Sequence, residues 1–390
     1  MRPIAVLSGL VILLAFAGSS GAQPKPEPMY QGKKAAEWVE VLVNDPSARQ
    51  RALAATALGK IWAEYKYEPA LTTLGRAIRL DTSPAVRVQA LNIIAGLEPD
   101  AVKKPLGADK QSVADDLVAA AKAEKEPRVR KDLATTIGLF PDAAKRAVEP
   151  LRSFLKDADP ATRTAAANAL GRVGVNAKEA LADVLPLLND PEAAVRRSAV
   201  FALARIAPDD VAAGSALARL LATEKDKDVR REIVISLGLF TERSGLVVQA
   251  VAGMMADPDL ETRRLAVRAL GRFGMSASPV ADELLKVAKS DKDKEVRVDA
   301  VRAFAAAVGP DALKGRVKDL YPILDGDPDF EVRLAVVEEL GALGNALKGD
   351  TETMAALQKR LNDPAAKVRT GAAEAIKRIE TRSKPPEKKP

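Results

Sequence analysis

Residues 189–206 read NDPEAAVRRSAVFALARI, and this stretch decides the fold of the whole chain. Asp190 and Pro191 open it, Arg196 follows six residues after Asp190, and Leu203 lies seven residues after Arg196. An Asp-Pro pair is typical of a tight turn that leads into the first positions of a helix. Beyond the turn, small and apolar residues recur at the spacing of one helix face. The stretch therefore predicts a turn followed by an amphipathic helix.

The same frame returns along the chain, with an acidic residue six positions before an arginine each time. Successive arginines are 33 to 43 residues apart. A period of about 20–50 residues indicates a solenoid of stacked units. The ten pairs are Asp45 and Arg51, Asp81 and Arg87, Glu124 and Arg130, Asp157 and Arg163, Asp190 and Arg196, Glu224 and Arg230, Asp257 and Arg263, Asp291 and Arg297, Asp327 and Arg333, and Asp363 and Arg369.

Each unit is predicted as a helix, a tight turn and a second helix. In the unit of Arg196, the two helices are expected over residues 179–188 and 195–206. In several units a glycine such as Gly171 follows the leucine of the second helix. Glycine costs about 1 kcal/mol of helix propensity relative to alanine, so we expect neighbouring helices to approach closely there. The pattern predicts an all-α protein in which about ten helical hairpins share one elongated core.

These frames resemble the HEAT-repeat family, in the short, alanine-rich form that is also seen in bilin-lyase-like repeats. The resemblance is carried by NDPEAAVRRSAVFALAR at 189–205, ADPDLETRRLAVRALGR at 256–272 and NDPAAKVRTGAAEAIKR at 362–378. It implies a right-handed α-α superhelix with the first helices on the convex side and the second helices on the concave side. It does not define a function, because this architecture serves scaffolds, receptors and a few enzymes.

The composition argues against several classes of function. The sequence has no Cys and no His, which removes cysteine nucleophiles, histidine bases and the metal sites that need either residue. The formal net charge is +7, but Arg2 supplies +1 and the tail after Glu380 supplies +3, which leaves +3 for the body. Such a surface does not predict a nucleic-acid partner. We expect no catalytic residue, no metal and no cofactor.

Four segments follow one another along the chain. Residues 1–22 are predicted to be a secretory signal peptide, because an apolar run follows Arg2 and small residues precede residue 23. An uncleaved membrane anchor is the alternative for this segment. Residues 23–29 are predicted to form a Pro-rich linker, 30–380 a single solenoid domain and 381–390 a disordered basic tail. The signal predicts export to the periplasm or the extracellular space, without a membrane span after cleavage.

Two irregular features are expected within the solenoid. Tyr30 and Trp38 are predicted to cover the exposed N-terminal end of the stack, since terminal repeats need a cap. The alternative is that these aromatic residues form a platform for a ligand. Residues 98–111 read EPDAVKKPLGADKQ and fill the widest interval between two arginines, so we expect an inserted loop there.

The ten acid–arginine pairs are expected to form a ladder that fixes the register between units. Arginine suits this role because its planar guanidinium can bridge two turns. We expect each arginine to pair with the acid of its own frame, so that replacing Arg196 leaves Asp190 unpaired. A row of arginines offered to an anion is the alternative, and it is disfavoured because every arginine has an acid at hand.

A second set of arginines is predicted to face the concave side in the middle of the chain. They lie on the second helices, opposite the buried stripe. These residues are Arg172, Arg197, Arg205, Arg231, Arg264, Arg268, Arg272 and Arg302. An ordinary solvated face is one explanation. A groove for an acidic peptide, protein or polysaccharide is the other, and its binding is expected to weaken with salt.

The sequence therefore predicts an exported, non-catalytic scaffold that binds a partner protein or peptide through its concave face. We expect a monomer. One alternative is a structural element of an envelope assembly without a discrete ligand. A less favoured alternative is an enzyme of the bilin-lyase-like type.

Overall fold

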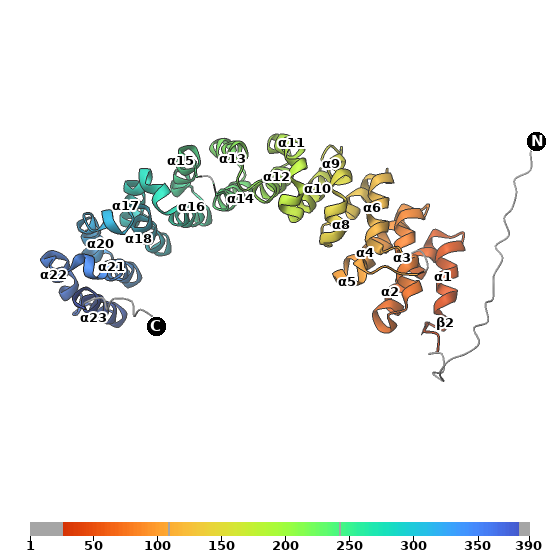
Figure 1. Cartoon of the computed structure of the whole chain (residues 1–390), viewed down its shortest axis with the longest axis horizontal. Helices are drawn as coiled ribbons and strands as arrows, with labels where there is room; N and C mark the ends of the chain where they lie inside the picture. The colour runs from red at the N-terminus through yellow and green to blue at the C-terminus, as the bar shows by residue number, and fades with distance from the viewer. Residues whose placement is uncertain (1–25, 108–109, 242, 382–390) are drawn as a thin grey trace, which may run out of the picture.

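The computed structural model describes residues 26–107, 110–241 and 243–381, and this part of the chain forms an all-α superhelix. Its helices lie in two rows that follow one long arc (Figure 1). The first helix of each hairpin lies in the outer row and the second helix lies in the inner row. The second helices thus line the concave side, as the family resemblance implies. The predicted signal segment and most of the basic tail lie outside the described residues.

The outer row contains the first helices and their short 3₁₀ continuations. They are α1 (Ala35–Asn44), α3 (Glu68–Leu80), α6 (Val113–Ala123), α9 (Val148–Phe154), α11 (Leu181–Val184) with η2 (Leu185–Asn189), α13 (Val211–Thr223), α15 (Gly245–Gly253) with η3 (Met254–Ala256), α17 (Ala281–Ser290), α20 (Tyr321–Gly326) and α22 (Thr351–Arg360).

The inner row contains the second helices, which pack side by side in chain order. They are α2 (Ala48–Tyr65), α4 (Pro84–Ala95), α7 (Pro127–Ile137), α10 (Pro160–Val173), α12 (Ala193–Ile206), α14 (Lys227–Leu237), α16 (Leu260–Phe273), α18 (Lys294–Val308), α21 (Phe330–Leu343) and α23 (Ala366–Glu380). Short segments connect one hairpin to the next: α5 (Pro99–Lys103), α8 (Pro141–Arg146), η1 (Gly174–Ala180), η4 (Gly274–Val280), α19 (Pro310–Leu313), η5 (Val317–Leu320) and η6 (Gly344–Leu347).

Local side-chain chemistry sets where several second helices begin. Asp159 is the N-cap of α10, and its carboxylate accepts a hydrogen bond from the backbone N–H of Thr162 at 3.0 Å. Asp259 caps α16 in the same way, with the N–H of Thr262 at 2.8 Å. Each cap satisfies a backbone donor that the first helical turn leaves free, which contributes about 1 kcal/mol.

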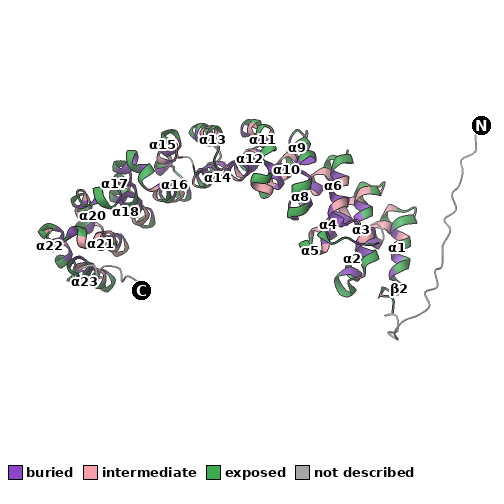
Figure 2. Ribbon diagram, in the orientation of Figure 1, coloured by how far each residue is buried: buried purple, intermediate pink, exposed green. Residues whose placement is uncertain are grey.

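The core lies between the two rows, and no hairpin encloses it alone (Figure 2). Its centre is filled by leucines, alanines and a few large residues such as Phe240, Phe273 and Phe304. The second helices approach closely at Gly171. A Cβ atom added there would lie 2.6 Å from the ring of Phe201 in the next repeat. Glycine thus allows the close approach that its position in the frame predicts.

The first helix predicted over residues 179–188 is interrupted in the structure. This stretch is divided among η1, α11 and η2. Pro186 lies at the start of η2 and has no N–H to donate, so it cannot continue the hydrogen-bond pattern of an α-helix. The second helix of the same unit begins at Ala193, two residues before the predicted start. The loop predicted over residues 98–111 contains α5, and an isolated β-bridge joins Leu106 to Gln111.

A small hairpin lies at the N-terminal end of the solenoid. Its strands β1 (Met29–Tyr30) and β2 (Lys33–Lys34) pair antiparallel, just before α1. Trp38 is 7% exposed, and its indole N–H donates to the carbonyl of Tyr30 at 2.9 Å. This arrangement favours the cap over a ligand platform. Among the described residues, no helix is both long and apolar enough to cross a membrane.

Candidate functional site

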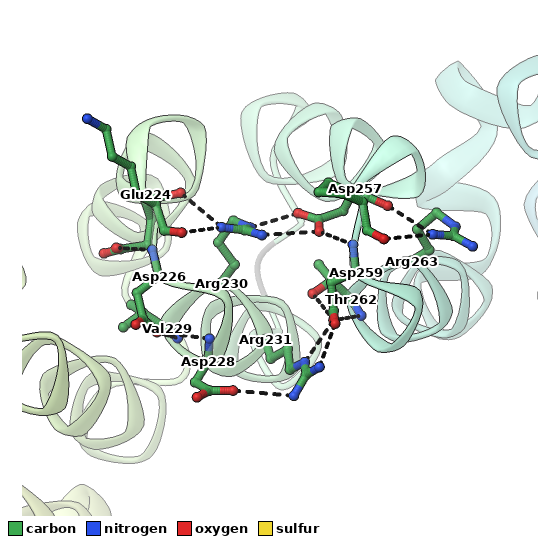
Figure 3. Close-up of polar contacts among 12 residues, drawn as sticks. Glu224, Asp226, Asp228, Val229, Arg230, Arg231, Asp257, Asp259, Thr262 and Arg263 are labelled. Atoms are coloured by element: carbon green, nitrogen blue, oxygen red, sulfur yellow. Dashed lines mark hydrogen bonds and ion pairs between the residues drawn. The ribbon is translucent and has the colours of Figure 1, made fainter.

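A ladder of charge-assisted hydrogen bonds runs along the edge where the first helix turns into the second. Figure 3 shows Arg230 between the turn of its own repeat and Asp257 of the next repeat. Its Nε and Nη2 atoms donate to the two carboxylate oxygens of Asp257 at 2.7 and 3.2 Å. Its Nη1 atom donates to the carbonyl of Lys225 at 2.7 Å. One guanidinium thus holds its own turn and joins it to the next.

An arginine–carboxylate ion pair links successive repeats along the described chain. The pairs are Arg51 with Asp81, Arg87 with Glu124, Arg130 with Asp157, Arg163 with Asp190, Arg196 with Glu224, Arg230 with Asp257, Arg263 with Asp291, Arg297 with Asp327 and Arg333 with Asp363. Arg369, the last arginine of the series, donates to the carbonyls of Asp363 and Pro364. The first acid of the series, Asp45, accepts the N–H of Ser47.

The expected pairing within one frame is wrong. Arg196 donates to the backbone carbonyl of Asp190 at 2.9 Å but not to its carboxylate. The carboxylate partner of Arg196 is Glu224 of the next repeat, at 2.7 Å. The carboxylate of Asp190 instead accepts the N–H of Glu192 and two bonds from Arg163 of the preceding repeat. The tight turn points its carboxylate toward the arginine of the preceding repeat. Replacing Arg196 therefore leaves Glu224 without its arginine.

Hydrogen bonding between the partners keeps the ladder charged against the effect of burial. The side chain of Asp363 is 0% exposed, and Arg333 lowers the pKa of its carboxyl group below the ordinary 3.8 although burial opposes this shift. Arg196 likewise lowers the pKa of Glu224 below its ordinary 4.5. The carboxylates in turn raise the pKa values of Arg333 and Arg196. These groups therefore stay ionised at neutral pH, and they are already fully engaged with one another.

Half of the arginines predicted on the concave face have a carboxylate partner one repeat further on. Arg231 donates two hydrogen bonds to Asp259, the N-cap of α16, at 2.8 and 2.6 Å (Figure 3). This contact is the main cause of the lowered pKa of Asp259. The other pairs are Arg264 with Glu295, Arg268 with Asp299 at 2.6 Å, and Arg302 with Glu338 at 3.1 Å. These four arginines form inter-repeat contacts and do not offer free charge.

The other four have no carboxylate within ion-pair distance among the described residues 26–107, 110–241 and 243–381. They are Arg172, Arg197, Arg205 and Arg272. Arg172 donates to the carbonyl of Gly138 at 3.2 Å. The guanidinium of Arg205 lies 3.7 Å from the ring centroid of Phe201 and donates to the carbonyl of the same residue. Burial raises the pKa of the nearby Glu232 carboxyl, and Arg205 and Arg197 oppose that shift electrostatically.

Hollows of the described surface lie between repeats. One of 380 Å³ opens on the concave side between α16, α18, α21 and α23, with Val298, Leu334 and Phe330 among its apolar residues. A larger one of 680 Å³ lies on the ladder edge between α15 and α17, where Ala252, Gly253 and other small residues replace long side chains. Neither contains a cluster of possible metal ligands, and the described residues hold no such cluster of three or more.

Sequence reasoning missed the aromatic and apolar part of this surface. Phe201 and Ile235 both stand five residues after a ladder arginine, and Leu139 and Leu239 stand nine after one. Leu239 is 49% exposed. The repeat frame itself contains the signal, because aligning the ten units shows large apolar residues at positions that are otherwise polar or small.

The hairpin array, its shared core and its inter-repeat ladder define the protein as an α-solenoid. The model of HEAT repeats matches residues 114–204, 174–238, 214–305 and 317–388, and the chain therefore belongs to the HEAT-repeat family. No curated protein matches this sequence significantly.

Solved structures with a similar fold include an engineered protein, Kap121p bound to Pho4p, and importin beta. The engineered protein is 22% identical over 89% of this chain and 99% of its own, with a TM-score of 0.56. Kap121p is 14% identical, with a TM-score of 0.54 over 88% of this chain, and importin beta is 16% identical, with 0.55 over 88%. The chain spans 41% of the Kap121p chain and 50% of the importin beta chain. At these identities the similarity concerns the fold.

Proposed function

We propose that this protein is a non-catalytic scaffold that holds a partner protein against its concave face. One observation carries the proposal. The ladder arginines from Arg51 to Arg333 are paired with carboxylates of the next repeat, whereas the concave face keeps arginines without such partners beside exposed apolar residues. A surface that combines charged groups with exposed apolar side chains is typical of a protein interface. The HEAT-repeat architecture and the similar fold of Kap121p, solved in complex with Pho4p, support this proposal.

The proposal includes export to the cell envelope or the extracellular space. It rests on residues 1–22, whose pattern of Arg2, an apolar run and small residues is that of a signal peptide. N-terminal sequencing of the protein from its native host tests this part. A mature chain that begins near Gln23 is expected, and a chain that retains residues 1–22 would contradict cleavage.

Site-specific photo-crosslinking tests the binding face. A photoreactive amino acid replaces Ile235, which is 38% exposed on the inner helix α14. The matched control replaces Leu246, which is 47% exposed on the outer helix α15. A discrete protein adduct is expected from position 235 and not from position 246. Adducts from position 246 alone, or equal labelling at both positions, would contradict concave binding. The absence of adducts at position 235 would favour a purely structural element.

A further inference from the structure

Five successive repeats present a common position along one rim of the concave face. This position is the ninth residue after the ladder arginine, at the C-terminal end of the second helix. In chain order its residues are Leu139, Arg172, Arg205, Leu239 and Arg272, and together we call them the rim track. They belong to the repeats of α7, α10, α12, α14 and α16. Two aliphatic and three cationic side chains therefore share this position over neighbouring repeats, in the order Leu, Arg, Arg, Leu, Arg.

The arginines of the rim track are held in place by groups that leave their charge unpaired. Arg172 reaches back to the carbonyl of Gly138, beside Leu139 in the preceding repeat. Arg272 lies over Gly238, because a Cβ atom added to that glycine would be 2.4 Å from its Nη2 atom. Arg205 is fixed by the ring of Phe201, which itself packs on Gly171. Preorganised guanidinium groups bind a carboxylate with a smaller loss of side-chain entropy.

The charge of the rim track is not cancelled by an ion pair within the described chain. None of its arginines has a carboxylate within ion-pair distance among residues 26–107, 110–241 and 243–381. Glu232 of α14 acts on Arg205 electrostatically, and burial raises the pKa of this carboxyl group. Arg172 and Arg272 are both exposed. The rim track thus offers two exposed cations and a third beside a half-buried acid.

The two leucines of the rim track indicate which class of anionic ligand it can bind. Leu139 is 40% exposed and Leu239 is 49% exposed. A polysaccharide supplies anions but few apolar groups, whereas a peptide supplies both. Packed helices lie about 8–10 Å apart, and a peptide in the polyproline II conformation rises about 3.1 Å per residue with about three residues per turn. One repeat therefore corresponds to about three peptide residues, and every third side chain lies on the same face of the peptide.

We propose that the rim track binds an extended acidic peptide segment of the partner protein. The segment adopts the polyproline II conformation and carries an aliphatic or acidic side chain at about every third residue, so that its acids face Arg172, Arg205 and Arg272. Its aliphatic side chains pack on Leu139 and Leu239. This inference rests on the concave binding role proposed above, and it adds the chemical class of the ligand and its register on the solenoid.

A synthetic fluorescent peptide tests the inference by anisotropy titration with the full chain. The peptide carries leucine, glutamate, glutamate, leucine and glutamate, in this order, at about every third residue, with serine and glycine between them. A second peptide has the reverse order, because the structure does not fix the chain direction. A third peptide replaces glutamate by glutamine. Saturable binding is expected for one of the first two peptides. The glutamine peptide is expected to bind at least about tenfold more weakly, as is typical of losing charge-assisted hydrogen bonds.

Protein variants locate the site. Arg172→Ala and Arg272→Ala are each expected to weaken binding about tenfold, and Leu239→Ser is expected to weaken it as well. The matched control is Arg302→Ala, which removes an exposed arginine of the same face outside the rim track. This control is expected to bind like the parent. Circular dichroism of each variant confirms the helical fold before titration.

Three outcomes overturn the inference. The first is no saturable binding by either glutamate peptide, and the second is equal loss in Arg302→Ala and Arg172→Ala. The third is binding of a sulfated polysaccharide that competes with the peptide but is unaffected by Leu239→Ser. If the partner still crosslinks at position 235 in any of these cases, the concave scaffold stands and only the ligand class is wrong. If that crosslink is absent too, both proposals fail.

Discussion

Replacing Arg333 by alanine removes one of the most buried contacts of the ladder. Arg333 is 9% exposed, and it donates to Asp363 from Nε at 2.9 Å and from Nη2 at 2.8 Å. Its Nη1 atom donates to the carbonyl of Asp327 at 2.8 Å. After the substitution, Asp363 keeps the N–H of Ala365 at 3.0 Å and Arg360, whose Nη1 atom is 3.6 Å away.

The expected loss follows from the charge that stays behind. Removing one partner of a buried ion pair costs about 3–5 kcal/mol, because the other charge remains desolvated. Arg360 compensates part of this loss, so we expect about 3 kcal/mol for Arg333→Ala, at the low end of that range. The matched control is Arg302→Ala, whose ion pair with Glu338 is 53% and 48% exposed. An exposed pair contributes less than about 1 kcal/mol.

Because each repeat contacts mainly its neighbours, the damage is expected to stay local. Hydrogen–deuterium exchange with mass spectrometry is the assay. Exchange is expected to rise in α22 and α23, beyond the broken contact, and to remain unchanged in α10 and α12. Urea unfolding supplies the free-energy difference, and Asp363→Asn completes a double-mutant cycle. Unchanged protection of α22 and α23, or equal free energies for Arg333→Ala and Arg302→Ala, would refute the assigned role of the ladder.

Three further predictions concern the contact between second helices, the stability of the ladder at low pH and the N-terminal end of the solenoid. Gly171→Ala is expected to lower the melting temperature although alanine has the better helix propensity, because the new Cβ atom would lie 2.6 Å from the ring of Phe201. The control is Gly253→Ala, where a Cβ atom would have no neighbour within 4 Å, and this change is expected to be neutral or stabilising. The folded-state pKa of Glu224 lies below its ordinary 4.5, so its contribution is complete above that pH and is lost as the pH falls through the lowered value. Urea midpoints from about pH 6 to about pH 3 should therefore fall less steeply for Glu224→Gln than for the parent. Trp38→Phe removes the bond from the indole to the hairpin carbonyl, and limited proteolysis is expected to cut the N-terminal end sooner, at a cost of about 1 kcal/mol.

The parts of the fold that depend on local chemistry could be predicted from the sequence. The buried stripe of the second helix predicts that Ala199 and Leu203 lie in the core, and both are 0% exposed. The Asp-Pro turn predicts a helix boundary near Pro191, and α12 begins two residues later, at Ala193. These signals act within a few residues, so they remain readable without knowledge of the stack. Repetition of the frame then predicts the solenoid.

The parts that depend on how the repeats stack could not be predicted in detail. The offset of six residues correctly brings Arg196 to its own turn, but it does not reveal that the carboxylate partner is Glu224 of the next repeat. The same limit applies to Arg231, whose partner Asp259 lies 28 residues further on. Pro186 shows a second limit, because a proline within an apolar run breaks a helix that periodicity alone predicts as continuous.

The ladder has a consequence for how the molecule can bend. Bidentate arginine–carboxylate contacts tolerate little change of distance or angle. We therefore expect the spacing between repeats to stay nearly constant along the turn edge. On the opposite edge, the contacts between successive repeats include neutral hydrogen bonds, such as those from the N–H and the hydroxyl of Thr241 to the carbonyl of Pro208, at 3.1 and 3.5 Å. We expect the repeats to splay about the turn edge, which widens or narrows the opposite edge while every helix stays intact. The C-terminal ends of the second helices lie on that opposite edge. The curvature of the arc therefore sets the spacing of the groups there, and a partner held by them is expected to respond to bending of the whole molecule.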